Sequence, residues 1–516
     1  MSLALRRDDD RLGALFEAAA VVLVALAAFS WRLLDDVGFW DTAIFQAAPP
    51  TLGLTHPTGF PTFNILGWLW TTILPLGTAA YEMNLFTALT GALAVGMVYV
   101  VSRQLRAGRL LSAGFALGVG LMVAWWKTAA RADPHPLHVL LALVVVSLLL
   151  AWNRGRRPRM LAFAAFAFAL GMGNHLLMAM LAPGVAVYVL TAKPSLLKEP
   201  RTILLSALAL VAGLAVYLYV PIRAAANPAI HYDYNPTTPD QVLRYILGRD
   251  FAGQMAFFST DGPGVAFREL ATLWRQMSDG MTVPIAMLVV VLAVVGFVGL
   301  LSDRQWRTAW LLGSTGGLTL YARLTYQNGD LERYALYPYA VFAILAAVGA
   351  QRLWSRATRV QGGEPVSLGR RPWSLEQSVV RVLPGVALAI PILLLSLNGS
   401  TIRIADARCY LTEATAEAPP NAAIVSWWSL TTPLWYGQAV EGLRPDLVVK
   451  SAASTVVDEI KAFQAEGRPV IIIQLDGELK KAQEAGFPMT QLDWCGQTAW
   501  QITGPAGSAP AAGVLP

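Results

Sequence analysis

The chain has 516 residues, of which 55% are hydrophobic and 14% are charged, and its mean hydropathy is +0.49. Because a soluble protein carries about 25% charged residues, this composition excludes an ordinary soluble domain and indicates an integral membrane protein. The net charge of +6 does not indicate a nucleic-acid partner. The arginines lie in short clusters between apolar spans, which is the pattern that orients membrane helices.

About eleven apolar stretches follow one another through residue 398, and about 20 helical residues suffice to cross a bilayer. The first begins after Arg11 and has no small-residue cleavage site, so it predicts a retained helix and not a cleaved signal. The eleven stretches are 13–34, 81–102, 110–126, 136–152, 160–173, 175–192, 202–222, 283–301, 308–323, 334–353 and 379–398. The sequence therefore predicts a mainly α, polytopic membrane domain over residues 1–398.

Clusters of lysine and arginine occupy every second connection between these stretches, and the positive-inside rule makes that side cytoplasmic. This assignment requires that residues 62–76 do not cross the membrane; Trp68 and Trp70 favour an interfacial or re-entrant helix there. The connections expected on the outer face are 35–80, 127–135, 223–282 and 324–333. We therefore expect a protein of the plasma (inner) membrane whose ionisable residues gather on the outer face.

The outer connection from Phe39 to Pro61 is the first candidate wall of an active site, because it carries Asp41 and His56. Pro49-Pro50 and the later prolines exclude a continuous helix, so we expect a structured loop. Asp41 either caps a short helix over residues 42–48 or accepts a proton from a hydroxyl group. A carboxylate inside the bilayer costs about 2.5–3.5 kcal/mol, so we expect Asp41 in a wet cleft.

The second outer connection carries Arg131, Asp133 and His135. Asp133 alone is compatible with an ordinary turn residue. However, Asp41 and Asp133 enter the same boundary from consecutive hairpins, each with a histidine nearby. The two acids together therefore predict one shared site.

Three later segments add candidate binding residues. The tight turn at residues 171–175 has two glycines that permit close backbone approach, and its Asn174 and His175 either donate hydrogen bonds or pack between helices. Arg223 leaves its span at headgroup height, where it either binds a phosphate bidentately or serves as a snorkelling arginine. Glu332 and Arg333 precede the tenth span and either bind substrate or cap that helix.

The long outer connection contains Thr238-Pro239-Asp240-Gln241, a capping box that predicts a helix through about Arg249. No CxxC, HExxH, P-loop or strand-linked GxGxxG motif is present in the sequence, so metal-hydrolase and soluble nucleotide chemistry have no support. No cofactor is indicated with certainty, and a divalent metal remains open.

After Asn398 the composition becomes that of a soluble domain. Strand-like runs at 423–427, 446–450 and 469–475 alternate with helical segments, one of which extends from near Ser454 to Gly467. We therefore predict a small extracytoplasmic α/β domain over residues 399–503, followed by a disordered tail, 504–516. Cys409 and Cys495 form either a disulfide or two free buried thiols.

Several motifs together resemble the polytopic GT-C glycosyltransferases related to protein O-mannosyltransferases, whose bacterial members are catalogued as a domain of unknown function. The similarity covers about residues 15–350. The motifs are Asp41-Thr42, residues 54–61, Asn84-Leu85, Gly91-Ala92, residues 126–137, 171–176, 181–184 and 221–228, and residues 329–338. Two positions depart from the usual pattern. Ile44 stands where relatives have an acid, and Asp133-Pro-His135 stands where they often have Glu-x-Tyr.

The resemblance implies transfer of a sugar, mannose-like, from a polyprenyl-phosphate donor to a protein or glycan hydroxyl on the outer membrane face, with inversion. On this basis Asp41 is expected to be the general base, and Asp133 and His56 to position the acceptor or the base. Arg223, with His175 and Asn174, would stabilise the leaving phosphate. Further candidate substrate contacts are Arg131, His135, Glu332 and Arg333.

A transporter or flippase of lipid-linked sugars is the alternative function. It would require ionisable residues at mid-span depth and often has paired half-repeats. Neither is found in the sequence, whose charged residues gather at one face. The enzyme interpretation therefore requires that Asp41 and Asp133 share one site.

Overall fold

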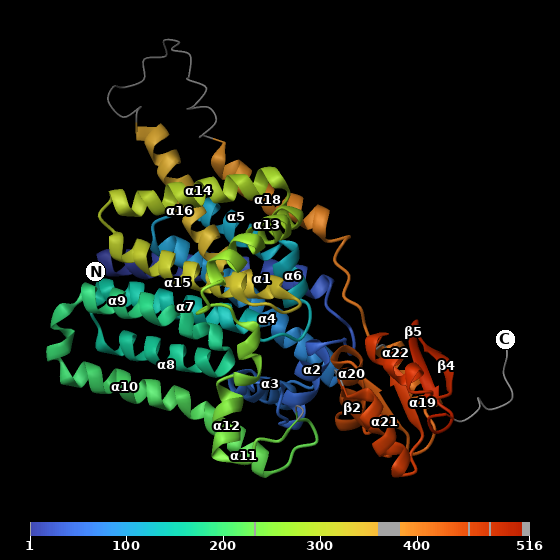
Figure 1. Cartoon of the computed structure of the whole chain (residues 1–516). Helices are drawn as coiled ribbons and strands as arrows, with labels where there is room; N and C mark the ends of the chain where they lie inside the picture. Colours follow the sequence, from blue (N-terminus) through green and yellow to red (C-terminus); the bar gives the residue numbers. More distant parts are fainter. Residues whose placement is uncertain (1, 232–233, 360–381, 453–454, 474–475, 508–516) are drawn as a thin grey trace.

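The computed structural model describes residues 2–231, 234–359, 382–452, 455–473 and 476–507. A large helical bundle forms most of the molecule, and the C-terminal domain lies beside one end of it (Figure 1). Most of the predicted tail, 508–516, lies outside the described residues.

The bundle is built almost entirely from helices, because long apolar runs can satisfy their backbone groups in lipid only within helices or closed barrels. In chain order the elements are α1 (Ser2–Trp31), α2 (Asp41–Thr51), α3 (Pro61–Ile73), α4 (Ala79–Gln104), α5 (Arg109–Gly120), α6 (Val123–Ala129), α7 (His135–Gly155), α8 (Pro158–Asn174), η1 (Leu176–Leu181), α9 (Ala182–Ala192), η2 (Pro194–Lys198), α10 (Pro200–Leu214), η3 (Ala215–Leu218), α11 (Tyr219–Ala225), α12 (Pro239–Ile246), η4 (Arg249–Gln254), α13 (Gly262–Met281), α14 (Val283–Ser302), α15 (Trp306–Thr325), η5 (Leu331–Ala335), α16 (Leu336–Arg359) and α18 (Leu383–Asn398).

The described parts of the predicted apolar stretches are largely helical, so the chain is an integral membrane protein. Among the described residues, six helices are long and apolar enough to cross a membrane, and α5 with α6, bent by 70°, forms a seventh candidate. The other predicted spans correspond to α8, η1–α9, α15 and α18, which are shorter or less apolar. The expected number of about eleven spans is therefore not confirmed.

The helices α4, α7 and α16 form the centre of the bundle, since most of each apolar window is buried (72%, 67% and 78%). In contrast, the continuous helix of residues 200–225 has only 17% of its window buried. Its outward leucines and isoleucines have no protein to cover them, as expected of a helix that faces lipid.

The prediction of a loop over Phe39–Pro61 is only partly right. Residues 41–51 form α2, which includes Pro49 and Pro50, and the loop is confined to residues 52–60. The two prolines are tolerated because they occupy the end of the helix. Leu52 ends it with a left-handed backbone, φ 51°, and its N–H bonds the carbonyls of Ala48 and Pro49.

Two other local predictions can be compared directly. The capping box at Thr238 and Gln241 is present and begins α12, but this helix ends at Ile246 and not at Arg249. Residues 62–76 contain the separate short helix α3, whose Trp68, Leu69 and Ile73 are exposed. Exposed apolar side chains on a short helix are consistent with the predicted interfacial position.

The C-terminal domain contains a five-stranded sheet with helices between strands. Its elements are α19 (Arg408–Glu417), β1 (Ala423–Ser426), α20 (Trp428–Ala439), β2 (Val448–Ser451), α21 (Val456–Ala465), β3 (Val470–Ile473), α22 (Asp476–Glu484), β4 (Met489–Trp494) and β5 (Gln497–Ile502). The strand order is β2-β1-β3-β5-β4; β1 runs parallel to β2 and β3, and β5 antiparallel to β3 and β4. The predicted strands are β1, β2 and β3.

The sequence analysis missed the hairpin of β4 and β5. Its two-residue turn is Cys495-Gly496, with φ of 52° and 77°. Positive φ at both positions is typical of a type I′ turn, which here has Cys in place of the usual Asn or Asp. Because Cys is uncommon at this turn position, the hairpin was not recognised in the sequence.

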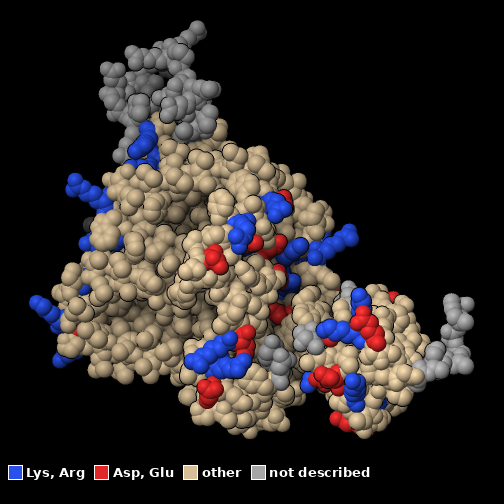
Figure 2. Space-filling model, in the orientation of Figure 1, with Lys and Arg blue, Asp and Glu red and all other residues tan. Residues whose placement is uncertain are grey.

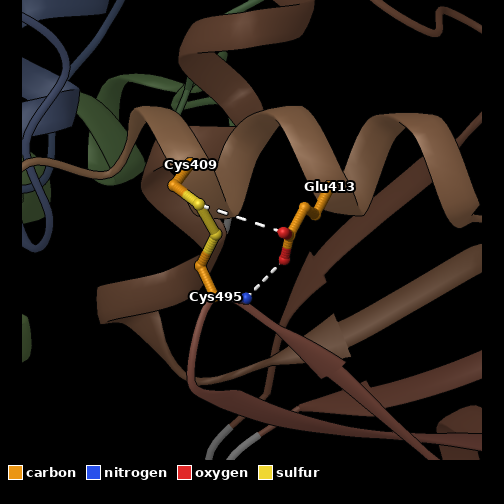
Figure 3. A group of neighbouring side chains, drawn as sticks. All are labelled: Cys409, Glu413 and Cys495. Atoms are coloured by element: carbon orange, nitrogen blue, oxygen red, sulfur yellow. Dashed lines mark hydrogen bonds between the residues drawn. A yellow bond between two sulfur atoms is a disulfide. The ribbon is translucent and has the colours of Figure 1, made fainter.

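The C-terminal domain is attached to the bundle by a continuous hydrophobic core that includes residues of α2, α4 and α20. Polar contacts reinforce it: Arg408 of α19 bonds Asp36 of the bundle at 2.7 Å and Glu441 at 2.6 Å. Cys409 and Cys495 form a disulfide, and the Glu413 carboxylate accepts a hydrogen bond from the Cys495 N–H (Figure 3). The helix α19 is thereby connected to both the bundle and the β4–β5 hairpin.

We predict that the Cys409→Ser, Cys495→Ser double variant loses about 2–4 kcal/mol of unfolding free energy in the C-terminal domain. The disulfide closes a loop of 86 residues, and its loss frees the unfolded chain. Thermal unfolding followed by limited proteolysis of this domain measures the effect. The single Cys409→Ser variant is the control and should behave like the double variant; an unchanged unfolding midpoint would contradict the prediction.

Candidate active site

The guanidinium of Arg333 joins the two acids that the sequence analysis singled out. Its Nη2 lies 2.5 Å from Asp41 Oδ2, and its Nη1 lies 3.0 Å from Asp133 Oδ2. The Arg333 side chain is 10% exposed, that of Asp41 20% and that of Asp133 1%. Asp41 and Asp133 therefore share one site, as the enzyme interpretation requires, and Asp41 is the acid that solvent can reach.

Buried polar residues of α4 hold the segments that carry the two acids. Asn84 Oδ1 accepts hydrogen bonds from Gln46 of α2 and from the Ala132 N–H. Thr87 Oγ1 accepts from the Asp133 N–H at 3.2 Å. These bonds fix the start of α7 relative to α2, because an unpaired polar group in a buried interior is costly.

Asp41 is not the N-cap of α2. That position is Trp40, and the Asp41 carboxylate in the first turn turns instead toward Arg333 and Trp428. Trp40, Phe60 and Asp330 all have positive φ, at 60°, 43° and 50°, and they lie beside α2, α3 and η5. Such backbone conformations in non-glycine residues cost about 1–3 kcal/mol and gather at functional sites.

Asp133 and His135 form a buried pair. Asp133 Oδ1 lies 2.7 Å from His135 Nδ1 and also accepts the His135 N–H at 2.8 Å. His135 Nε2 is buried and has no hydrogen-bond partner among the described residues. With the proton held on Nδ1 by the carboxylate, Nε2 carries the free lone pair.

Four of the chain's five histidines lie in one aromatic cluster around this pair. The ring of His135 lies 4.6 Å from those of His175 and Tyr334, and His138 lies 5.9 Å from His175. His56 packs between Phe45, Phe60 and Trp428. His175 Nδ1 accepts the Leu177 N–H, so its Nε2 bears the proton when the ring is neutral.

Charge and burial act against each other on the acids and on His56. Burial would raise the pKa of Asp41, but the charges of Arg333 and His56 and hydrogen bonds from Arg333 and Trp428 lower it to about 2. Burial likewise opposes ionisation of Asp133, yet His135 and Arg333 hold its pKa well below the usual range. Burial lowers the pKa of His56, against the attraction of Asp41. Both acids are therefore ionised at neutral pH.

The remaining predicted residues divide into two groups. Arg131 bonds Asp330 at 2.5 Å, and Asn174 donates to the Pro134 carbonyl at 2.9 Å, so both support the site from its edge. Arg223 lies elsewhere: its Nε donates to the Leu52 carbonyl at 2.6 Å, and it forms no ion pair with any carboxylate in the described ranges. Glu332 likewise has no hydrogen bond or ion pair within the described part of the chain.

The sequence analysis did not identify two contributors to the site. His138 lies one helical turn after His135 on α7, and its spacing alone was a usable signal. Trp428 comes from the C-terminal domain, and its indole Nε1 donates to Asp41 Oδ1 at 2.8 Å. No pattern in the sequence indicates that a residue 387 positions away reaches Asp41.

The acids and histidines described here do not bring three ligand atoms within 4.8 Å of one another. Among the described residues, only Cys409, Glu413 and Cys495 bring three ligand atoms within 4.8 Å of one another. The two sulfurs of that group are joined in a disulfide (Figure 3), so they are not thiolate ligands. A hollow of about 430 Å³ lies close to the cluster of histidines and tyrosines. It is lined by Arg268 and Glu269 of α13 and by Tyr326, Gln327, Asn328 and Leu331.

The chain is similar in sequence to known protein O-mannosyl-transferases. Residues 41–198 match the family described as the protein O-mannosyl-transferase TMEM260 N-terminal domain. Over 378 residues the chain is 28% identical to the protein O-mannosyl-transferase TMEM260 of Mus musculus, covering 68% of this chain and 51% of that relative. The predicted resemblance is confirmed. The chain spans about half the length of this curated relative.

Solved structures give the fold. ArnT from Cupriavidus metallidurans bound to undecaprenyl phosphate superposes with a TM-score of 0.57 at 15% identity, covering 96% of this chain and 99% of ArnT. The Archaeoglobus fulgidus oligosaccharyltransferase in the apo form gives 0.56 at 13% identity, with 96% and 75% covered. The chain has the GT-C fold. This confirms the predicted helical membrane domain with its small C-terminal α/β domain.

We predict that Arg333→Gln destabilises the protein by about 3–5 kcal/mol, since it leaves Asp133, 1% exposed, without its cation. Thermal unfolding in lipid nanodiscs measures the loss. The matched control is Arg352→Gln at the other end of α16, where Arg352 pairs with Asp303, 53% exposed, at 2.6 Å. That change should cost about 0–1 kcal/mol; equal losses in the two variants would contradict the prediction.

The pH dependence of stability follows from Asp41. Its pKa falls from 3.8 to about 2 on folding, so its contribution is complete above about pH 4 and is lost as the pH falls toward 2. Between pH 5 and pH 2 the unfolding free energy of the wild type should therefore fall on the order of 1–2 kcal/mol more than that of Asp41→Asn. Denaturant unfolding at both pH values tests this, and parallel losses in the two proteins would refute it.

Proposed function

We propose that this chain is a membrane glycosyltransferase that moves a sugar, mannose-like, from a polyprenyl-phosphate donor to a hydroxyl of a protein or glycan, with inversion. The main support is the Asp41–Arg333–Asp133 arrangement, in which Asp41 is ionised and partly exposed at an end of a GT-C bundle. Asp41, His56, Asp133 and His175 all lie within residues 41–198, the range that is similar to the protein O-mannosyl-transferase family.

Asp41 acts as the general base in this proposal. The acceptor oxygen attacks the anomeric carbon and transfers its proton to the Asp41 carboxylate, while the bond from that carbon to the donor phosphate breaks. The phosphate leaves with the bonding electron pair, and attack from the opposite side inverts the anomeric centre. A base of this kind contributes about 10²–10⁴-fold to the rate.

The neighbours of Asp41 keep it ready for this step. Arg333 maintains the ionised carboxylate, and Asp133 fixes Arg333 and His135 from the buried side. Asp133 therefore has a positioning role, and His56 packs against the Trp428 ring beside Asp41. His135 is 3% exposed and its Nε2 is buried, so like Asp133 it supports the site from the buried side and does not contact the substrate.

Arg223 is proposed to bind the donor phosphate. It is partly buried, near the loop of residues 52–60, and a planar guanidinium can bind a phosphate bidentately. The same loop carries His56, whose ring packs against that of Trp428 beside Asp41. The proposed phosphate contact and the acids are therefore linked through this loop. The ArnT structure with the same fold was solved with undecaprenyl phosphate, a lipid of the proposed donor class.

The proposed step draws its positive charge from Arg333 and assigns no role to a divalent metal. The oxygens of Asp41 and Asp133 already accept hydrogen bonds from Arg333, Trp428 and His135, and three ligand atoms do not converge at these acids in the described residues. The guanidinium of Arg333 supplies the positive charge beside Asp41.

We place the site on the outer face of the plasma (inner) membrane. Lysine and arginine predominate at the end of the bundle farthest from the C-terminal domain, whereas acidic and basic residues mix near that domain (Figure 2). The positive-inside rule then assigns the C-terminal domain and the acids to the outer side. The donor lipid would lie between the helices with its phosphate at headgroup height.

We predict that Asp41→Asn lowers sugar transfer about 10²–10⁴-fold, because the amide cannot accept the proton. Purified membranes are incubated with radiolabelled polyprenyl-phosphate-mannose, and label is followed into protein, glycan and lipid. Asp330→Asn is the control, since Asp330 is 46% exposed and forms ion pairs with Arg131 and Arg333.

Transfer by Asp41→Asn at the wild-type rate would refute the base assignment. Movement of intact labelled lipid across the membrane without transfer would favour the alternative, a transporter or flippase of lipid-linked sugars.

A further inference from the structure

Trp428, the first residue of α20 in the C-terminal domain, contacts the proposed base in the membrane bundle. Its indole Nε1 donates to Asp41 Oδ1 at 2.8 Å, and Arg333 Nη2 donates to Oδ2 at 2.5 Å. Each carboxylate oxygen thus has one directional donor, and the two donors come from different domains. Two donors on opposite oxygens restrict rotation of a carboxylate about its terminal torsion, which is otherwise broad.

The start of α20 is fixed against the start of α2. The Trp40 N–H bonds the Ser429 carbonyl at 3.3 Å, and Thr432 Oγ1 donates to the Trp40 carbonyl at 2.7 Å. These bonds join the residue before Asp41 to the residues after Trp428. The position of α20 relative to α2 therefore fixes the Trp428 indole beside Asp41.

Aromatic neighbours hold the ring itself. The Trp428 ring lies 6.0 Å from that of His56 at 89° and 5.6 Å from that of Trp435 at 82°. Edge-to-face contacts of this kind restrain the ring plane and hence the direction of the N–H. The indole is consequently supported from the bundle by His56 and from its own domain by Trp435.

We propose that Trp428 is a positioning residue of the active site, which holds Asp41 with a free lone pair toward the acceptor hydroxyl. The C-terminal domain then completes the catalytic site in addition to any role in choosing the acceptor. This inference rests on the proposed function for its consequence in transfer. The contact itself, and its effect on the Asp41 carboxylate, can be measured without any transfer reaction.

The first experiment measures protonation of Asp41 in the full-length protein. A hydrophobic carbodiimide modifies protonated carboxyl groups, and peptide mass spectrometry gives the rate at Asp41. Trp428→Phe keeps the stacking ring and removes the donor, which should raise the pKa of Asp41 from about 2 by about one unit. Labelling at pH 4 should then rise about tenfold.

The other groups that face Asp41 stay unchanged in this comparison. They are Arg333 and Tyr334 of η5, His56 of the 52–60 loop, Asp133 before α7, and Tyr326. The matched control is Trp494→Phe, which removes an indole hydrogen bond elsewhere in the C-terminal domain, to Glu417 Oε2 at 2.9 Å. That control should label Asp41 at the wild-type rate, and equal labelling in all three proteins would overturn the proposal.

The second experiment measures transfer kinetics with the radiolabelled donor. Trp428→Phe should lower kcat about tenfold with little change in the acceptor KM, whereas Trp494→Phe should leave kcat unchanged. Thermal unfolding shows that both variants are folded. An unchanged kcat in Trp428→Phe refutes its role in the reaction. If the wild type transfers no sugar but labelling still rises in Trp428→Phe, the proposed function fails and the positioning of Asp41 by Trp428 stands.

Discussion

The bridge from Arg333 to Asp41 and Asp133 is the interaction on which the site depends. Two carboxylates so near each other repel, and burial penalises both, so a single cation between them is what permits both to stay ionised. The arginine comes from η5, Asp41 from α2 and Asp133 from the segment before α7, and the bridge therefore also fixes three separate segments relative to one another. The Arg333 guanidinium therefore contributes both to the stability of the fold and to the ionisation of Asp41 and Asp133.

Exposure gives the two acids different roles. Asp133 is 1% exposed and binds His135 and Arg333 through separate oxygens, so it orients its partners and has no surface for a substrate. Asp41 is 20% exposed and receives donors from Arg333 and Trp428. This asymmetry is what the proposed reaction requires, in which an acceptor hydroxyl reaches Asp41 while Asp133 only positions its partners.

Sequence patterns predicted the outer acids, the histidines at 56, 135 and 175, and Arg333 as candidates, and the structure brings these residues together. The same reasoning grouped Arg223 and Glu332 with them, but neither contacts the acids in the described residues. Topology places residues on a face of the membrane, and side-chain direction within that face depends on packing. For this reason Arg223 turns toward Leu52, and Glu332, next to Arg333 in sequence, does not join the bridge.

The composition and the order of basic clusters along the chain were enough to predict an integral membrane protein with a soluble C-terminal domain. Hydropathy and the spacing of basic clusters are properties of the sequence alone. Local signals likewise determined the capping box at Thr238 and the strands β1, β2 and β3. Only the tertiary structure decided that α2 continues through Pro49-Pro50, that Cys409 pairs with Cys495, and that Trp428 meets Asp41. For the disulfide and the Trp428 contact the physical reason is distance along the chain: their partners are 86 and 387 positions apart, and such contacts arise from the packing of whole elements, which no local pattern in the sequence indicates.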